Sequence, residues 1–128
     1  MILNGGLKDE HAALAELGHV DGVMLGRAAY DDPMLLGRLD AALFRHAPVP
    51  VLDALERYFD YAAREVGRGT RLHAITRHLM GVFAGRPGGR RWRRALGEWP
   101  RTGDDAAALD ALRALAHNVA NGEASRAA

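Results

Sequence analysis

The sequence predicts a mainly α-helical protein that begins with a short βαβ segment and continues as a C-terminal helical bundle. Two observations lead to this fold class. Near the N-terminus, two short apolar runs each stop at glycine, and a segment with helical spacing separates them. From residue 34 onward, apolar residues recur three or four positions apart, which is the spacing of an amphipathic helix.

The βαβ segment occupies the first 25 residues of the chain. Residues 1–3 form an apolar run typical of a strand, and residues 8–17 follow with helical spacing. Gly18 is the expected C-cap of this helix. Residues 20–25 predict the second strand. Because a helix joins the two strands, we expect them to lie parallel.

The rest of the sequence predicts helices that are separated by turn-forming residues. The expected helices span residues 34–44, 53–66, 72–83, 90–99 and, from an N-cap at Asp104 or Asp105, up to residue 119. The Asp31-Asp32-Pro33 segment is expected to cap the first of them. Between helices we expect a linker at residues 46–50, a turn at 85–89 and a loop at 100–103, and the chain is expected to fray at 125–128.

Composition restricts the classes of protein to which the chain can belong. With 48% hydrophobic and 26% charged residues, the 128-residue chain has the composition of a globular protein. The absence of cysteine excludes disulfides, thiolate metal sites and a cysteine nucleophile. No apolar run approaches the roughly 20 residues of a membrane span. There is no secretory signal pattern at the N-terminus, so we expect a cytoplasmic protein.

Other kinds of reactive site are not indicated. Ser125 is the only serine and lies in the C-terminal tail, so the sequence offers no hydrolytic triad. The histidines other than His78 show no metal-ligand spacing with acids or with one another, and we expect no metal site. We therefore assign no catalytic residue and no metal ligand to this chain.

Positive charge is concentrated in the middle of the chain, although the formal net charge is only +1. The segment from Arg64 to Arg94 holds nine arginines, and Glu65 is its only acid. Such a local excess of positive charge attracts phosphate groups. A solvated arginine-rich face without a ligand is the alternative, and charge alone does not decide between the two.

The ends of the two expected strands carry residues suited to binding an anion. The first strand runs into Asn4, Gly5 and Gly6, and the second into Gly26 and Arg27. Glycines let a backbone approach an anion closely, and an arginine can donate two parallel hydrogen bonds to phosphate oxygens. In (β/α)₈ barrels, the loops after the last two strands often form a phosphate site. The spacing thus indicates the last two strands of such a barrel, although Gly-Gly can be only a turn.

Two parallel strands do not form a stable sheet by themselves. Residues 1–45 are therefore expected to be the end of a larger α/β fold, and the chain a C-terminal piece of a longer protein. Residues 50–120 have enough helical sequence to fold as a domain.

A cluster of basic residues surrounds Trp92 in the helix expected at residues 90–99. Arg90 shares one side of that helix with Arg93 and Arg94, so two or three charges can contact successive phosphates, and Arg91 lies close to them. The alternative is a solvated helix in which Trp92 anchors the packing. We expect Trp92 to lie in the core in either case.

Two further candidates for nucleic-acid contacts precede this helix. Arg77 and His78 lie in the segment ITRH, where Ile75 and Leu79 are expected to face inward. The outward-facing pair can contact RNA or can cap a neighbouring helix, and both alternatives stay open.

Three segments together resemble a known family. LNGGLK at residues 3–8, HVDGVMLGRAAYDDP at 19–33 and ITRHLMGVFAGRPGGRRWRRALGE at 75–98 resemble the C-terminal part of a tRNA-dihydrouridine synthase of subfamily A. The resemblance runs from about Met1 to Glu98, and would correspond to about the last third of a full-length member. Little resemblance extends beyond Trp99.

The resemblance implies a fold, a reaction and two binding sites. Family members use FMN, reduced by NADPH, to reduce uridine to 5,6-dihydrouridine in the tRNA D-loop. Residues 1–45 would be the remnant of the FMN-binding barrel, with Asn4, Gly5, Gly6, Gly26 and Arg27 at the phosphate. Residues 50–120 would be the helical tRNA-binding domain. Its contacts would come first from Arg90 and Arg93, then from Arg91, Arg94, Arg77 and His78.

The sequence also departs from the family pattern. The family's proton donor to the uracil ring is a cysteine, and the chain has none. The lysine and histidine that contact the flavin lie upstream in the family, and Lys8 and His11 do not replace them because they follow the glycine pair. The isolated chain is therefore expected to be inactive.

Two other functions fit the sequence. Residues 50–120 could act as a stand-alone helical RNA-binding module, or the chain could be a helical interaction protein whose arginines only improve solubility. Flavin binding would favour the synthase, and salt-sensitive tRNA binding without flavin binding would favour the RNA-binding module. If the chain showed neither property, the interaction protein would be the remaining hypothesis.

Overall fold

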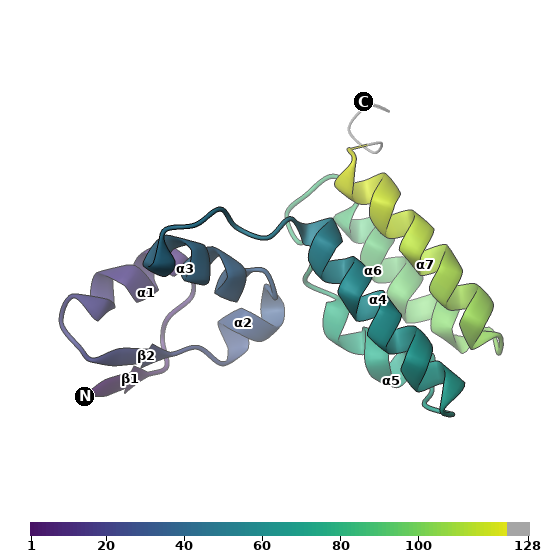
Figure 1. Cartoon of the computed structure of the whole chain (residues 1–128), viewed down its shortest axis with the longest axis horizontal. Coiled ribbons are helices and arrows are strands. Elements are labelled where there is room, and N and C mark those ends of the chain that lie inside the picture. The colour runs from purple at the N-terminus through teal and green to yellow at the C-terminus, as the bar shows by residue number, and fades with distance from the viewer. Residues whose placement is uncertain (123–128) are drawn as a thin grey trace. The chain divides into compact units, whose positions relative to one another are not determined.

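The chain folds into two units, Met1–Val49 and Pro50–Ala128 (Figure 1). The computed structural model describes residues 1–122, so the fraying expected at residues 125–128 lies outside the described part. Seven α-helices and one two-stranded parallel sheet make up the described fold. The predictions of a mainly helical protein and of an N-terminal βαβ segment are confirmed.

The first unit is a parallel strand pair packed against helices. β1 (Ile2–Asn4) and β2 (Gly22–Met24) pair in parallel, with Ile2 opposite Gly22 and Asn4 opposite Met24. The connecting helix α1 (Glu10–Leu17) begins where the Asp9 carboxylate accepts the Ala12 N–H at 2.8 Å. This side chain caps one of the donors that a helix N-terminus leaves unpaired, so the helix begins two residues later than predicted.

Two helices follow β2. α2 (Arg27–Asp31) was not predicted, and α3 (Leu35–Phe44) matches the helix expected at residues 34–44. A small core of Ala13, Leu35 and Leu39 joins α1 to α3, and Val23 packs against it. Most of the large hydrophobic side chains that stay exposed belong to this unit, including Ile2 at 71% and Met24 at 51%. The strand face that carries these two residues is therefore not covered by the helices of the unit.

The prediction that the Asp31-Asp32-Pro33 segment caps α3 is wrong. Met34 is the N-cap residue of α3 and makes no side-chain cap hydrogen bond. The Asp32 carboxylate instead accepts a hydrogen bond from Arg38 Nη2 at 2.6 Å. A guanidinium is a stronger partner for a carboxylate than a backbone N–H, so the ion pair replaces the cap.

The second unit consists of helices around one larger core. Its elements are α4 (Val51–Gly67), α5 (Leu72–Thr76), the 3₁₀ turn η1 (Arg77–Leu79), α6 (Gly89–Glu98), the 3₁₀ turn η2 (Trp99–Arg101) and α7 (Asp105–Ala120). α7 packs against both α4 and α6 (Figure 1). Among the described residues, seventeen buried hydrophobic side chains form this core and three form the core of the first unit, so the second core is the larger source of apolar stabilisation.

The start of α7 confirms one of the two N-caps that the sequence allows. The Asp104 carboxylate accepts the Ala107 N–H at 3.0 Å, whereas Asp105 Oδ2 accepts the Leu72 N–H at 2.9 Å. Asp104 is therefore the N-cap of α7, and Asp105 ties α7 to the first residue of α5.

A single helix over residues 72–83 is not formed. The α-helix ends at Thr76, and η1 and a series of turns take its place. The Trp92 indole N–H donates to the Leu79 carbonyl at 2.9 Å, and the Val82 N–H donates to the same carbonyl. The Leu79 carbonyl thus accepts hydrogen bonds from Val82, three positions ahead, and from Trp92 of α6. These bonds take the place of the hydrogen bond from four positions ahead that continues an α-helix. Similarly, the loop expected at 100–103 begins as the 3₁₀ turn η2.

Candidate phosphate site and nucleic-acid interface

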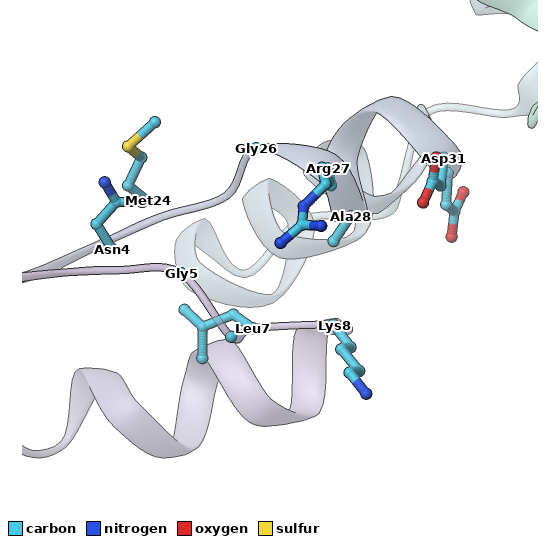
Figure 2. Close-up of a pocket in the computed structure, with 11 residues that line it drawn as sticks. Asn4, Gly5, Leu7, Lys8, Met24, Gly26, Arg27, Ala28 and Asp31 are labelled. Carbon is cyan, nitrogen blue, oxygen red and sulfur yellow. The ribbon is translucent and has the colours of Figure 1, made fainter.

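The parallel pairing of β1 and β2 places the two glycine-bearing loops at one edge of the sheet. Asn4 is the last residue of β1 and pairs with Met24, the last residue of β2. Both strands therefore end at the same edge of the sheet, where β1 continues into Gly5 and β2 continues toward Gly26. In Figure 2 the Asn4 and Met24 side chains stand on the same side of the strand pair.

The loop after β1 depends on its glycines. Gly5 has φ of 95° and Gly6 has φ of 75°, both in the left-handed region that side-chain-bearing residues rarely adopt. No heavy atom lies within 4 Å of the point where a Cβ would stand at either glycine, or at Gly26. The backbone on both loops is thus open to the approach of a ligand.

Arg27 supplies the positive charge between these loops. It is the first residue of α2, it is exposed, and it forms no ion pair with any residue in the 1–122 range. Its guanidinium extends from α2 toward the segment that holds Gly5, Leu7 and Lys8 (Figure 2). An arginine with its N–H donors unused at the rim of an open loop is suited to an anionic ligand.

A cavity of about 660 Å³ lies between the two loops, which is within the range of small-molecule sites. The structure brings all five predicted phosphate-site residues to this cavity. The residues that line it are Asn4, Gly5, Gly6, Leu7, Lys8, Met24, Gly26, Arg27, Ala28, Asp31 and Asp32.

Sequence reasoning missed several lining residues. Lys8 was set aside because it follows the glycine pair, yet it lines the cavity, and in Figure 2 its ammonium is turned away from Arg27. Its position four residues after the strand end was the signal that could have identified it. Asp31 and Asp32 also line the cavity, at the end of α2, and they add negative charge to its rim.

Arg38 holds the helices around the cavity together. Its Nε donates to Glu10 Oε1 at 2.9 Å, and its Nη2 donates to Glu10 Oε2 at 3.3 Å and to Asp32 Oδ2 at 2.6 Å. The hydrogen bond from Arg38 and a backbone hydrogen bond lower the pKa of Glu10. Asp32 first, and Glu10 second, raise the pKa of Arg38. One guanidinium on α3 thus connects α1 to the end of α2 and neutralises part of the acidic rim.

The lowered pKa of Glu10 gives the stability of the first unit a pH dependence. Because the pKa is lower in the folded than in the unfolded state, ionised Glu10 stabilises the fold fully above its ordinary value of 4.5. This contribution is expected to be lost as the pH falls through the folded pKa. Urea unfolding of the first unit, followed through its amide resonances, should show a midpoint that decreases over this window. The Glu10→Gln variant should show a smaller decrease, and an equal decrease in both proteins would contradict the assignment.

The predicted RNA-contacting arginines of α6 are all exposed, whereas Trp92 is fully buried as expected. Gly89, Trp92, Ala95 and Leu96 form the buried side of α6. Arg94 Nε donates to Glu98 Oε1 at 3.2 Å, one helical turn away. Within residues 1–122, Arg90, Arg91 and Arg93 form no ion pair. The four arginines therefore differ in the partners they already have.

Arg77 and His78 lie in η1, and both are exposed. η1 packs against α6, and the Trp92–Leu79 hydrogen bond links the two elements. The second unit thus positions both groups of predicted RNA-contacting residues on connected elements.

Across residues 1–122, no group of three or more histidine, aspartate or glutamate side chains is arranged to hold a metal ion. No helix in this range has both the length and the apolar character needed to cross a membrane.

Comparison with known proteins identifies the family. The family model described as "Dihydrouridine synthase (Dus)" matches residues 1–119. The protein is 46% identical over 98 residues to the tRNA-dihydrouridine(20/20a) synthase of Xanthomonas campestris pv. campestris, covering 77% of this chain and 29% of the relative. It is 45% identical over 103 residues to that of Escherichia coli strain K12, covering 77% and 29%.

The similarity to the same enzyme of Salmonella typhi extends further, with 42% identity over 123 residues that cover 91% of this chain and 36% of the relative. The chain spans about a third of the length of these relatives. The family match covers both glycine-bearing strand ends and the arginines of α6. The chain therefore belongs to the dihydrouridine synthase family.

Proposed function

We propose that this chain supplies the FMN-phosphate site and the tRNA-binding domain of a tRNA-dihydrouridine synthase. In this proposal, residues 1–45 are the last two strands of a (β/α)₈ barrel, and residues 50–120 are a C-terminal helical bundle that binds tRNA. The observation that carries it is the convergence of the two glycine-bearing strand ends and Arg27 on one cavity. In barrel enzymes the loops after the last two strands often bind phosphate.

The residues around the cavity fit a phosphate group. Gly5 and Gly6 leave the backbone uncovered, Gly26 does the same on the second loop, and Arg27 offers N–H donors that no carboxylate within residues 1–122 uses. Asp32 would repel a phosphate, but its carboxylate is hydrogen-bonded to Arg38. The Asp32 carboxylate is thus partly neutralised, and the Arg27 guanidinium, which extends toward the loop after β1, favours an anionic ligand.

In this proposal FMN, reduced by NADPH, supplies the reducing equivalents for the C5–C6 bond of a uridine in the tRNA D-loop. This chain's own residues bind and orient. Asn4, Gly5, Gly6, Gly26 and Arg27 hold the phosphate and so fix one end of the cofactor. The chain has no cysteine that could protonate the uracil ring, and we propose that it does not complete the reaction by itself.

We further propose that the exposed arginines of the second unit bind the tRNA backbone. Arg90 and Arg93 are the first candidates from the family resemblance and, like Arg91, both are exposed and neither is paired with an acid in the described residues. Arg91, Arg94, Arg77 and His78 are the others. Contacts between arginine and phosphate release counterions from RNA, so the binding should weaken steeply with salt.

Flavin binding tests the proposal. Titrating the ¹⁵N-labelled chain with FMN should shift the amide resonances of Gly5, Gly6 and Gly26, whereas riboflavin, which lacks the phosphate, should leave them unchanged. Equal shifts with both flavins, or none with FMN, would contradict a phosphate site. Salt-sensitive tRNA binding without any response to FMN would instead favour a stand-alone RNA-binding module.

A further inference from the structure

A second pair of basic side chains lies outside α6. Arg101 Nη2, at the end of η2, lies 3.1 Å from His73 Nε2 in α5. Because a guanidinium has only donors, the His73 Nε2 must accept this hydrogen bond, and the ring proton resides on Nδ1. Within residues 1–122 neither side chain forms an ion pair with a carboxylate. The positive charge of Arg101 therefore has no carboxylate partner within residues 1–122.

Both residues are carried by well-anchored elements. Before Arg101, Pro100 is fully buried, and after it the Thr102 hydroxyl and N–H both donate to the Trp99 carbonyl, at 2.9 and 3.2 Å. Before His73, Leu72 is fully buried and its N–H donates to Asp105. η2 packs directly on α5. A ligand would therefore meet a pair that is already positioned, which lowers the entropic cost of binding.

The acids at the start of α7 form no ion pair with Arg101 or His73. Asp105 accepts the Leu72 N–H, and Asp104 accepts the Ala107 N–H as the N-cap of α7. Arg101 keeps its Nε and Nη1 donors without a partner in the described residues, and its side chain is exposed. These donors stay available to hydrogen-bond an anion.

The pair lies on elements that contact those carrying the proposed RNA-binding residues. His73 precedes Arg77 by four residues, which is about one helical turn, so the two side chains leave neighbouring turns of the α5–η1 segment. Arg77 is in turn connected to α6 through η1. The elements η2, α5, η1 and α6 thus contact one another in series, with the Arg101–His73 pair between η2 and α5 and Arg77 in η1.

We propose that Arg101, positioned by His73, binds a backbone phosphate of the same RNA that α6 binds. This inference rests on the proposed tRNA-binding function. Among anions, an RNA phosphate fits best. The elements that carry the pair contact elements with other exposed basic residues, an arrangement that suits an extended polyanion better than a small anion in a closed pocket. Arg101 contributes a phosphate contact, and His73 acts as a positioning residue.

The test is a titration of an unmodified tRNA transcript with the full 128-residue chain at several salt concentrations. Arg101→Gln is expected to weaken binding about threefold to tenfold and to reduce the slope of log K against log salt by about 0.7 to 1. His73→Ala retains the Arg101 charge but removes the ring that positions it. We expect it to weaken binding about twofold to threefold with the salt slope unchanged.

Two controls separate this inference from the proposed function. Arg57→Gln removes the same charge from an exposed position on α4 and should change the affinity less than twofold, whereas Arg90→Gln tests the α6 contacts. If the unmodified chain shows no salt-dependent tRNA binding, both proposals fail. If it binds, and Arg90→Gln weakens it while Arg101→Gln matches Arg57→Gln, only the second phosphate contact is overturned. Should Arg101→Gln unfold, wild-type affinity in a folded His73→Ala variant would overturn the inference instead.

Discussion

Replacing Trp92 with alanine is expected to bring the helical unit to the edge of unfolding. Trp92 is fully buried, packs edge-on against Phe83 with ring centroids 5.2 Å apart, and donates its indole N–H to the Leu79 carbonyl. Truncating a buried tryptophan costs about 3–5 kcal/mol, a large part of the 5–15 kcal/mol that stabilises a typical domain. The Leu79 carbonyl would also lose a partner that holds η1 against α6.

Urea unfolding followed by circular dichroism at 222 nm measures this loss. Trp92→Phe retains most of the apolar volume but not the N–H donor, and should cost less, about 1–3 kcal/mol. Arg91→Ala changes an exposed neighbour and should stay within about 0.5 kcal/mol of the wild type. If Trp92→Ala unfolded with the same urea midpoint as the wild type, Trp92 would not anchor α6.

Replacing Arg27 with glutamine is expected to weaken FMN binding about tenfold to hundredfold, because hydrogen bonds to a charged group contribute about 1.5–3 kcal/mol. The side chain is exposed, so its loss should not change the stability of the first unit. The remaining glycine amides would still contact the phosphate, so we expect weaker binding rather than none. The affinity is read from the shifts of the Gly5, Gly6 and Gly26 resonances during the FMN titration.

A charge-matched control is available in the same unit. Arg45→Gln removes one positive charge at the C-cap of α3, outside the residues that line the cavity. It should bind FMN as the wild type does, apart from a small long-range effect that salt suppresses. Equal weakening in the Arg27 and Arg45 variants would show that net charge, rather than a contact at the strand ends, controls binding.

The N-terminal part of the fold could be predicted because its signals are local. Each strand is an apolar run that ends at glycine, and the helix between them has a clear period. A helical crossover then requires the strands to be parallel. From these facts alone, Gly5, Gly6, Gly26 and Arg27 were placed at one edge, and the structure gathers them around one cavity.

Features that depend on distant residues could not be predicted. α2 has only five residues, too few to show a helical period. The turns that follow α5 include the Leu79 carbonyl, which is bound by Trp92, 13 residues further along the chain. The predicted periodicity of residues 72–83 was real, since Leu72, Ile75, Leu79 and Phe83 are all buried, but it did not specify a continuous helix.

The polar contacts around both candidate sites show the same limit. Arg38 and Glu10 are 28 residues apart, as are Arg101 and His73. No spacing rule connects positions so far apart in sequence, because their contact is created by the packing of the elements that carry them. The sequence alone therefore does not indicate the contacts of Arg38 and Arg101.

The unequal cores of the two units have a consequence for measured affinities. A unit held together by few buried side chains opens locally at a lower free energy than one with a large core, and its amides should exchange faster with solvent. Only the closed form presents both strand ends to a phosphate. The apparent dissociation constant for FMN is then the intrinsic constant divided by the closed fraction. Any contact that keeps the first unit closed, such as the one between Arg38 and Glu10, would raise cofactor affinity without touching the cofactor.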